Sequence, residues 1–153
     1  MVDIFRFKVS LRTGQSTFCT RTIDIKGSSS LAKLAEAIID AYDFDFDHAF
    51  GFYDNLNNPY KSNESYTLFA DMDDTDPSED GKSVKKTKLS SAFEAGKTLA
   101  FLFDYGDDWL FNVNCSSIGK ADPDIKYPLV IASKGKAPEQ YPDYDDDEDE
   151  YVA

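Results

Sequence analysis

The chain has 153 residues, of which 41% are hydrophobic and 14% aromatic, and its formal net charge is -13. This length and composition allow a core of its own, so we expect one folded domain. No apolar run approaches the ~18 residues needed to cross a bilayer, and the first residues lack the basic start and apolar centre of a signal peptide. We therefore expect a cytoplasmic protein.

The negative charge is concentrated near the C-terminus, where residues 143–150 contain seven acids and no base. Such a segment cannot bury enough surface to offset its ordering entropy. We predict a domain over residues 1–142 and a disordered acidic tail over residues 143–153. Because a phosphate backbone is attracted to basic surfaces, the acidity disfavours direct binding of nucleic acid.

The first part of the chain predicts a hairpin followed by a helix. Residues 4–12 and 17–25 alternate apolar and polar side chains, which is typical of half-buried strands. Apolar residues then recur at helical spacing over residues 31–42, and Ser29 or Ser30 is placed to cap the helix. The helix is expected to pack on the sheet.

The middle of the chain predicts shorter elements. Strands are expected over residues 48–53 and 66–70, and the first of them completes a ββαβ order compatible with a ubiquitin-like start. The polar residues 71–88 are expected to form a mobile loop. Ser91 and Glu94 have the spacing of a capping box, in which each side chain bonds the other's backbone N–H, and this predicts a short helix.

The densest apolar and aromatic run, residues 99–115, predicts a central hairpin that turns at Gly106-Asp107-Asp108. We expect an odd-length loop, because this register gathers the large side chains on one face whereas a two-residue loop scatters them. The predicted pairs are Tyr105 with Trp109, Phe103 with Phe111 and Phe101 with Val113.

A polar connection over residues 116–126 and an edge strand over residues 127–131 are expected to follow. The fold class is thus a single α+β domain, with an antiparallel or mixed sheet of about six strands, one main helix and one short helix. Cys19 and Cys115 lie in separate strand-like runs, which favours buried free thiols over a disulfide or a metal site.

Aspartates at the hairpin turn are candidate metal ligands. Asp104, Asp107 and Asp108 supply the carboxylate oxygens that Mg²⁺ or Ca²⁺ prefers. Asp and Gly are also the residues that a tight turn requires, so a solvated turn without a metal is the simpler interpretation.

The single histidine, His48, excludes a multi-histidine zinc site. It is a candidate general base beside Asp45 or Asp47, because the pKa of imidazole ordinarily lies near neutrality. A structural role between helix and strand is the simpler interpretation. Trp109 and Tyr105 are candidate binding residues, but core packing explains the aromatic run better than a platform for bases, since no basic residues are interleaved with it.

Three segments carry a resemblance to a known family. Residues 103–109 resemble its Tyr-Asp-Phe-Gly-Asp-x-Trp signature, with Phe103 and Tyr105 in place of Tyr and Phe. Phe44 takes the place of a family tryptophan ahead of His48, and Phe52 matches a later Phe.

The third segment is Tyr127-Pro128 together with residues 137–141, which resemble the family's Tyr-Pro and Pro-Pro-Glu-Asp segments. Glu139 is a candidate binding residue there, but Gln140 stands where an acid is usual. The chain thus resembles the plasmid pRiA4b ORF-3-like family from about Phe5 to Tyr141. The resemblance implies strands around a helix and an association with mobile genetic elements, and it implies no activity.

These observations predict a non-enzymatic binding or accessory module that acts on a partner protein without a cofactor. The alternative is a metal-assisted hydrolase or nuclease that uses His48, Asp104, Asp107 and Asp108. It requires these side chains to converge, so a distance of more than ~10 Å between His48 and the carboxylates would exclude it. The sequence leaves the oligomeric state open.

Overall fold

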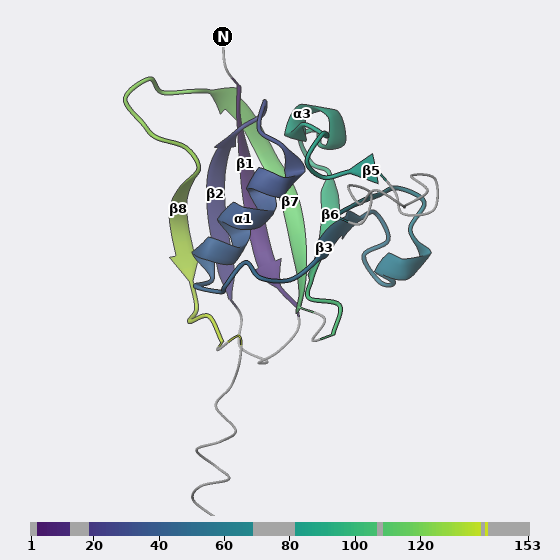
Figure 1. The fold of residues 1–153 in the computed structure, drawn as a ribbon. Coiled ribbons are helices and arrows are strands. Elements are labelled where there is room, and N and C mark those ends of the chain that lie inside the picture. The colour runs from purple at the N-terminus through teal and green to yellow at the C-terminus, as the bar shows by residue number, and fades with distance from the viewer. Residues whose placement is uncertain (1–2, 13–18, 69–81, 107–108, 139, 141–153) are drawn as a thin grey trace, which may run out of the picture.

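The structure is a computed structural model that describes residues 3–12, 19–68, 82–106, 109–138 and 140. Its α-helices lie on one face of a single sheet (Figure 1). The elements are β1 (Asp3–Leu11), β2 (Thr20–Lys26), α1 (Leu31–Ala41), β3 (Phe50–Tyr53), the 3-10 helix η1 (Pro59–Lys61), β4 (Ser65–Thr67), β5 (Lys82–Ser83), α3 (Leu89–Ala92), β6 (Thr98–Phe103), β7 (Trp109–Lys120) and β8 (Leu129–Lys134).

The sheet has eight strands in the order β5-β4-β3-β6-β7-β1-β2-β8. It is mixed, because β4 and β5 are parallel whereas the other neighbours are antiparallel. The expected α+β class is confirmed, but the expected number of about six strands is too low. One extra strand, β5, has only two residues and lies in a polar stretch, so no hydrophobic pattern predicts it.

The ββαβ order is present in the chain, but β6 and β7 lie between β1 and β3 in the sheet. The ubiquitin-like start is therefore not confirmed. The reason is that β1 has β2 on one side and β7 on the other, and all nine of its residues pair with β7. The expected polar connection over 116–126 was wrong in its first half, because β7 continues to Lys120.

The first hairpin and the main helix match the sequence pattern. Phe5, Phe7 and Val9 are buried on the face that α1 covers. The helix begins after Ser30, whose hydroxyl oxygen accepts a hydrogen bond from the backbone N–H of Lys33 at 3.1 Å. Such a cap satisfies one of the N–H groups that a helix end leaves unpaired.

The buried side chain of Arg21 joins β2, α1 and β8 at the end of the sheet where α1 ends. The side chain of Arg21 in β2 donates to the carbonyl oxygens of Ala41, at the end of α1, and of Lys134 and Gly135, at the end of β8. A guanidinium next to the C-terminal end of a helix also interacts favourably with the helix dipole. Arg21 therefore fixes the end of α1 against the sheet, just before the loop that carries the candidate site.

The central hairpin forms, but its predicted register is wrong by two residues. The observed pairs are Phe103 with Trp109, Phe101 with Phe111 and Leu99 with Val113. The chain leaves the strand earlier than expected because Asp104 adopts a positive φ of 66°. A shift of two residues keeps the side chains of the paired strands on their faces, so Phe101, Phe103, Trp109, Phe111 and Val113 share one core as predicted. Tyr105 lies beyond the end of β6 and packs in the cluster on the other face, so its predicted place beside Trp109 is wrong.

The short helix α3 begins at Leu89, with Lys88 in the N-cap position, and no side chain in the described part of the chain caps its backbone N–H groups. The predicted capping box is wrong, because Ser91 lies inside the helix.

Cys19 and Cys115 are buried free thiols, as expected. Within the described residues, no helix is long and apolar enough to span a membrane. The acidic tail lies outside the described residues.

Candidate functional site

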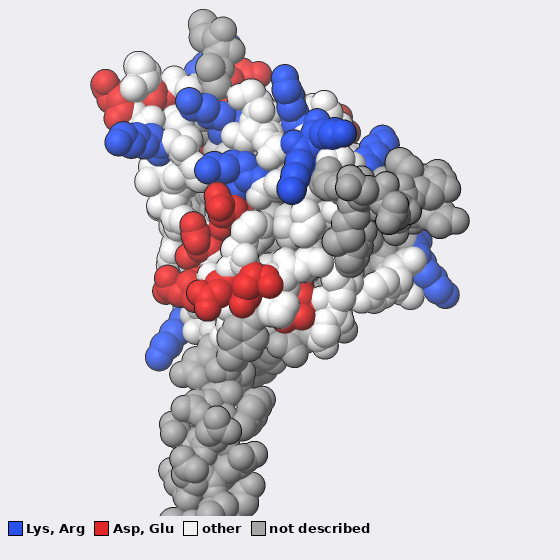
Figure 2. All heavy atoms as spheres, viewed as in Figure 1, with Lys and Arg blue, Asp and Glu red and all other residues white. Residues whose placement is uncertain are grey.

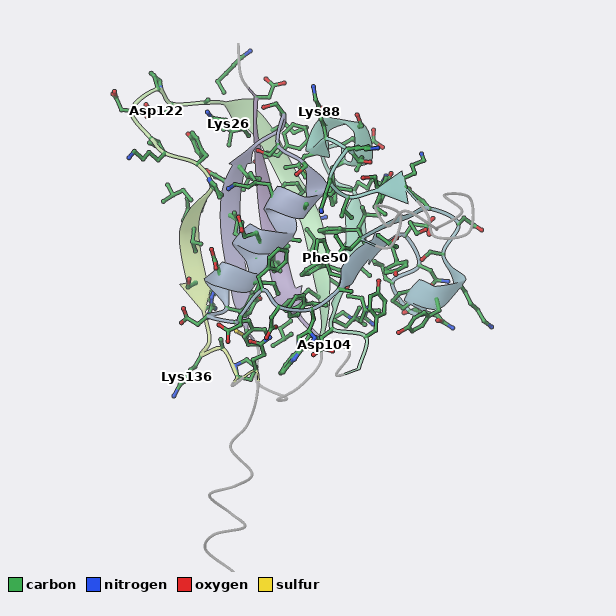
Figure 3. The ribbon with its side chains drawn as sticks, viewed as in Figure 1. Lys26, Phe50, Lys88, Asp104, Asp122 and Lys136 are labelled. Atoms are coloured by element: carbon green, nitrogen blue, oxygen red, sulfur yellow. The ribbon has the colours of Figure 1, made fainter. Side chains whose placement is uncertain are left out.

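The candidate site lies at the end of the sheet where the loop after α1 meets the β6–β7 turn. Figure 3 shows Asp104 at this end, far from Lys26 and Lys88 at the other. His48, just before β3, places its Nε2 atom 3.3 Å from Asp104 Oδ2 and 3.4 Å from Asp47 Oδ1. The loop and the turn thus bring together His48 and Asp104, which are 56 positions apart in the sequence.

Asp104 is held from several sides. Its backbone N–H donates to the carbonyl of Ala49 at 2.9 Å, and its Oδ1 accepts from the N–H of Gly106 at 3.1 Å. An aspartate that bonds the backbone two residues on is a turn-forming arrangement that also tolerates a positive φ. The carboxylate is therefore part of the turn and, through Oδ2, a partner of His48.

The imidazole of His48 is 38% exposed and its ring lies edge-on to Phe103, with centroids 6.0 Å apart. A carboxylate beside one ring nitrogen fixes the orientation of the ring. The same arrangement serves a general base or a metal-bound histidine in enzymes. In the described part of the chain, no group of three or more His, Cys, Asp or Glu side chains is placed to hold a metal ion.

Trp109 and Tyr105 lie on opposite faces of the sheet. Trp109 belongs to the main core, where its ring lies edge-on to Phe44 with centroids 4.8 Å apart. Its indole N–H is buried and has no hydrogen-bond partner among the described residues. Tyr105 belongs to a small second cluster with Tyr53 on the other face, and the two hydroxyls are 2.6 Å apart. Burial and the bond to Tyr53 raise the pKa of Tyr105 far above its ordinary value.

The loop between α1 and β3 carries features that sequence reasoning missed. Phe46 is 39% exposed, and its ring stacks on Phe103 with centroids 6.1 Å apart. Gln140 binds the peptide groups of Asp45 on both sides: its Oε1 accepts from the N–H at 2.6 Å and its Nε2 donates to the carbonyl at 3.1 Å. The only available signal was the departure of Gln140 from the acid that the family pattern places there.

Charged side chains are unevenly distributed over the face that α1 covers. In Figure 2, Lys and Arg gather towards the end that carries the start of α1, and acids gather along α1 and below it. The exposed acids of this region are Glu36, Asp40, Asp43, Asp45 and Asp47. The candidate site therefore lies in a field of negative charge. Asp107, Asp108 and Glu139 lie outside the described residues, so their proposed roles stay predictions.

Comparisons with known proteins agree with the fold. In a crystal structure, a protein of unknown function from Methanosarcina mazei Go1 matches with a TM-score of 0.72 and 24% identity, over 90% of this chain and 72% of that chain. At this identity the likeness shows the fold alone. No curated protein matches the chain. The model of the plasmid pRiA4b ORF-3-like family matches residues 3–143, so the chain belongs to this family.

Proposed function

We propose that the chain is a non-enzymatic cytoplasmic binding or accessory module, associated with mobile elements, that binds a basic segment of a partner protein. The binding surface is the loop after α1, and we call residues 43–48 the acidic loop. The observation that carries the proposal is Phe46, a large apolar side chain that is 39% exposed and stands between the exposed carboxylates of Asp45 and Asp47.

The acidic loop is held before any partner binds. At its start, Asp43 has a positive φ of 59°, and the N–H of Phe44 bonds the carbonyl of Ile39 at 3.0 Å. In its middle, Gln140 bonds both peptide groups of Asp45. Preorganisation of this kind lowers the entropic cost of binding.

The chemistry of the acidic loop defines its partner. An aromatic side chain that is already packed on one side offers a rigid anchor, and such anchors dominate the binding energy of protein interfaces. Carboxylates around the anchor steer a basic partner and exclude an acidic one. A segment with an apolar residue between lysines or arginines fits both features.

Comparative affinity capture tests this proposal. The full chain and two variants, Phe46→Ala and Tyr60→Ala, are used as baits and the captured proteins are quantified by mass spectrometry. Tyr60 is 65% exposed on the η1 helix, so its variant is a matched loss of an exposed aromatic ring elsewhere. We expect a protein that the wild type and the Tyr60 variant capture and the Phe46 variant loses. Equal capture by all three baits contradicts the proposal.

A second candidate function has a specific observation in its favour. His48 lies 3.3 Å from Asp104, well within the limit of ~10 Å above which a metal-assisted hydrolase is excluded. In this function His48 activates a water molecule, and Asp104 orients the imidazole of His48. The negative charge around the site attracts a divalent cation.

Thermal unfolding of the full chain with Mg²⁺, Mn²⁺ or Ca²⁺ separates the two functions, because a ligand of the folded state raises its stability. The His48→Ala variant is the control, since it keeps the acidic tail and its nonspecific binding of cations. A saturable increase in Tm that the variant loses supports the hydrolase. Equal increases in both proteins exclude a cation site at His48.

A further inference from the structure

The face of the sheet that α1 and α3 leave uncovered has a hollow of about 320 Å³ over β1, β2 and the end of β7. Its apolar wall comes from Ile4 and Ile125, and its polar groups come from Arg6, Ser117, Lys120 and Tyr127. This volume is within the range of small-molecule sites in proteins. The hollow is on the other side of the sheet from the acidic loop.

A buried carboxylate fixes the main cation of this hollow. Asp24 is only 7% exposed, and its oxygens accept from Arg6 Nε at 2.8 Å and from Arg6 Nη2 at 3.0 Å. This bidentate pair raises the pKa of Arg6 above its ordinary value, through the hydrogen bond and the charge of Asp24. The guanidinium is therefore held in one orientation.

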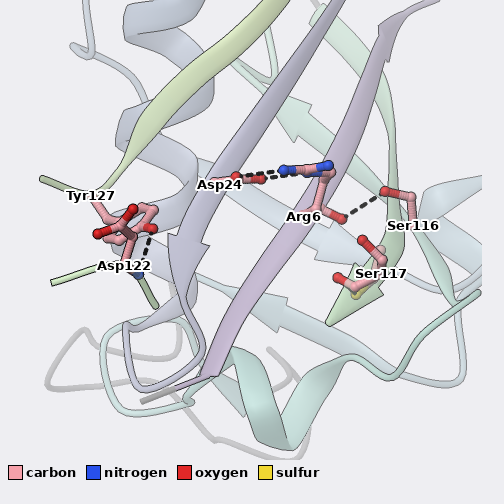
Figure 4. Close-up of polar contacts among 7 residues, drawn as sticks. Arg6, Asp24, Ser116, Ser117, Asp122 and Tyr127 are labelled. Atoms are coloured by element: carbon pink, nitrogen blue, oxygen red, sulfur yellow. Dashed lines mark hydrogen bonds and ion pairs between the residues drawn. The ribbon is translucent and has the colours of Figure 1, made fainter. Parts of the chain in front are cut away.

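The remaining donors of the hollow are open to a ligand. Arg6 has five N–H groups, and within the described residues only two of them are bonded, one on Nε and one on Nη2. Its side chain is 47% exposed. Figure 4 shows Tyr127 and Ser117 on either side of the pair that Arg6 and Asp24 form. The Tyr127 hydroxyl accepts from the N–H of Asp122 at 3.1 Å, which leaves its own proton to donate.

The charge and shape of the hollow select one class of ligand. Its charged lining consists of Arg6, Lys120 and Asp24, an excess of one cation in a chain whose formal net charge is -13. At Gly119, which lines the same hollow, an added Cβ would meet no heavy atom within 4 Å. The space above this glycine is therefore open, and isoleucines border it.

We propose that this hollow binds a small organic anion, in which a carboxylate or phosphate is attached to an apolar body. The anionic group pairs with the outer N–H groups of Arg6 and with Lys120, and the hydroxyls of Ser117 and Tyr127 complete its hydrogen bonds. The apolar body packs over Gly119 between Ile4 and Ile125. A planar guanidinium suits the planar fork of a carboxylate and the oxygens of a phosphate.

Isothermal titration calorimetry on the full chain tests the site with 2-naphthoate and 2-naphthyl phosphate as probes. Uncharged 2-naphthamide and inorganic phosphate test the charge and the apolar body separately. We expect saturable binding of at least one anionic probe, and binding at least tenfold weaker for both controls. The anionic probe that binds more tightly identifies a carboxylate or a phosphate as the natural group.

Three variants connect this binding to the hollow. Gly119→Leu places a side chain in the open space, where its Cβ meets no heavy atom within 4 Å, and is expected to abolish binding. Lys120→Met is expected to weaken binding by at least fivefold, and Lys8→Met, which removes an exposed charge of β1 outside the lining, is expected to leave it unchanged. Circular dichroism verifies that each variant is folded. The proposal is overturned if neither anionic probe binds, if 2-naphthamide binds as tightly, or if Gly119→Leu binds like the wild type.

Discussion

Replacement of Gln140 tests how the acidic loop is held. Gln140→Ala removes both hydrogen bonds to the peptide groups of Asp45, and Gln140 is only 8% exposed, so water replaces them poorly. At ~1 kcal/mol for each bond, we expect a loss of about 2 kcal/mol in the free energy of unfolding. For a domain of this size that corresponds to a fall in Tm of roughly 4–8 °C.

Gln140→Glu is a sharper variant of the same test. The new carboxylate still accepts from the N–H of Asp45, but it has no proton for the carbonyl and places two acceptors together. We expect a loss of at least ~1 kcal/mol at pH 7, and recovery below about pH 4, where a protonated carboxyl group donates again. Lys136→Ala is the control, because Lys136 is an exposed residue four positions earlier.

Thermal unfolding followed by circular dichroism gives the stabilities, and hydrogen exchange gives the protection of the Asp45 amide. The reasoning predicts that both Gln140 variants expose this amide whereas Lys136→Ala does not. Unfolding temperatures within 1 °C of the wild type, together with unchanged exchange at Asp45, would refute it.

Three further predictions concern the scaffold. Ser30→Ala removes the cap of α1 and should lower the free energy of unfolding by about 1 kcal/mol in a denaturant titration, whereas Ser30→Asp should not. Burial alone would raise the pKa of Glu64. The hydrogen bonds that its carboxylate accepts from Lys97 and Tyr66 outweigh this effect and lower the pKa below its ordinary value of 4.5. The stability that this supplies is present above pH 4.5 and is lost as the pH falls through the lowered pKa, so pH-dependent unfolding of Glu64→Gln should be flatter there. Burial raises the pKa of Cys115, so its alkylation by iodoacetamide should be slow until denaturant unfolds the chain, and fast alkylation in buffer contradicts this.

The hydrophobic pattern was sufficient for the elements whose burial repeats at a regular spacing. β1 alternates between faces and α1 repeats at helical spacing, and both form close to the predicted residues. The family model confirms the resemblance that residues 103–109 and the segment around His48 carried. These features are local, so one sequence was enough to find them.

The missed features depend on groups far apart in the chain. The hairpin register was wrong because the positive φ of Asp104 is supported by Ala49 and Gly106, and the first of these contacts is tertiary. β5 exists only because β4 pairs with it. Gln140 reaches Asp45 across 95 positions, and no hydrophobic period can encode such a bond. The pairing of His48 with Asp104 was allowed by the sequence, but only the fold places them together.

Photo-cross-linking from the acidic loop tests the central claim most directly. The full chain carries p-benzoylphenylalanine at position 46 or, as the control, at position 60, and both proteins are irradiated in an extract. The account predicts a discrete adduct from position 46 that is absent from position 60, that weakens as salt rises and that maps to a basic segment of the partner. An absence of adducts from position 46, or the same adducts from both positions, would contradict the assignment of the acidic loop as the binding surface.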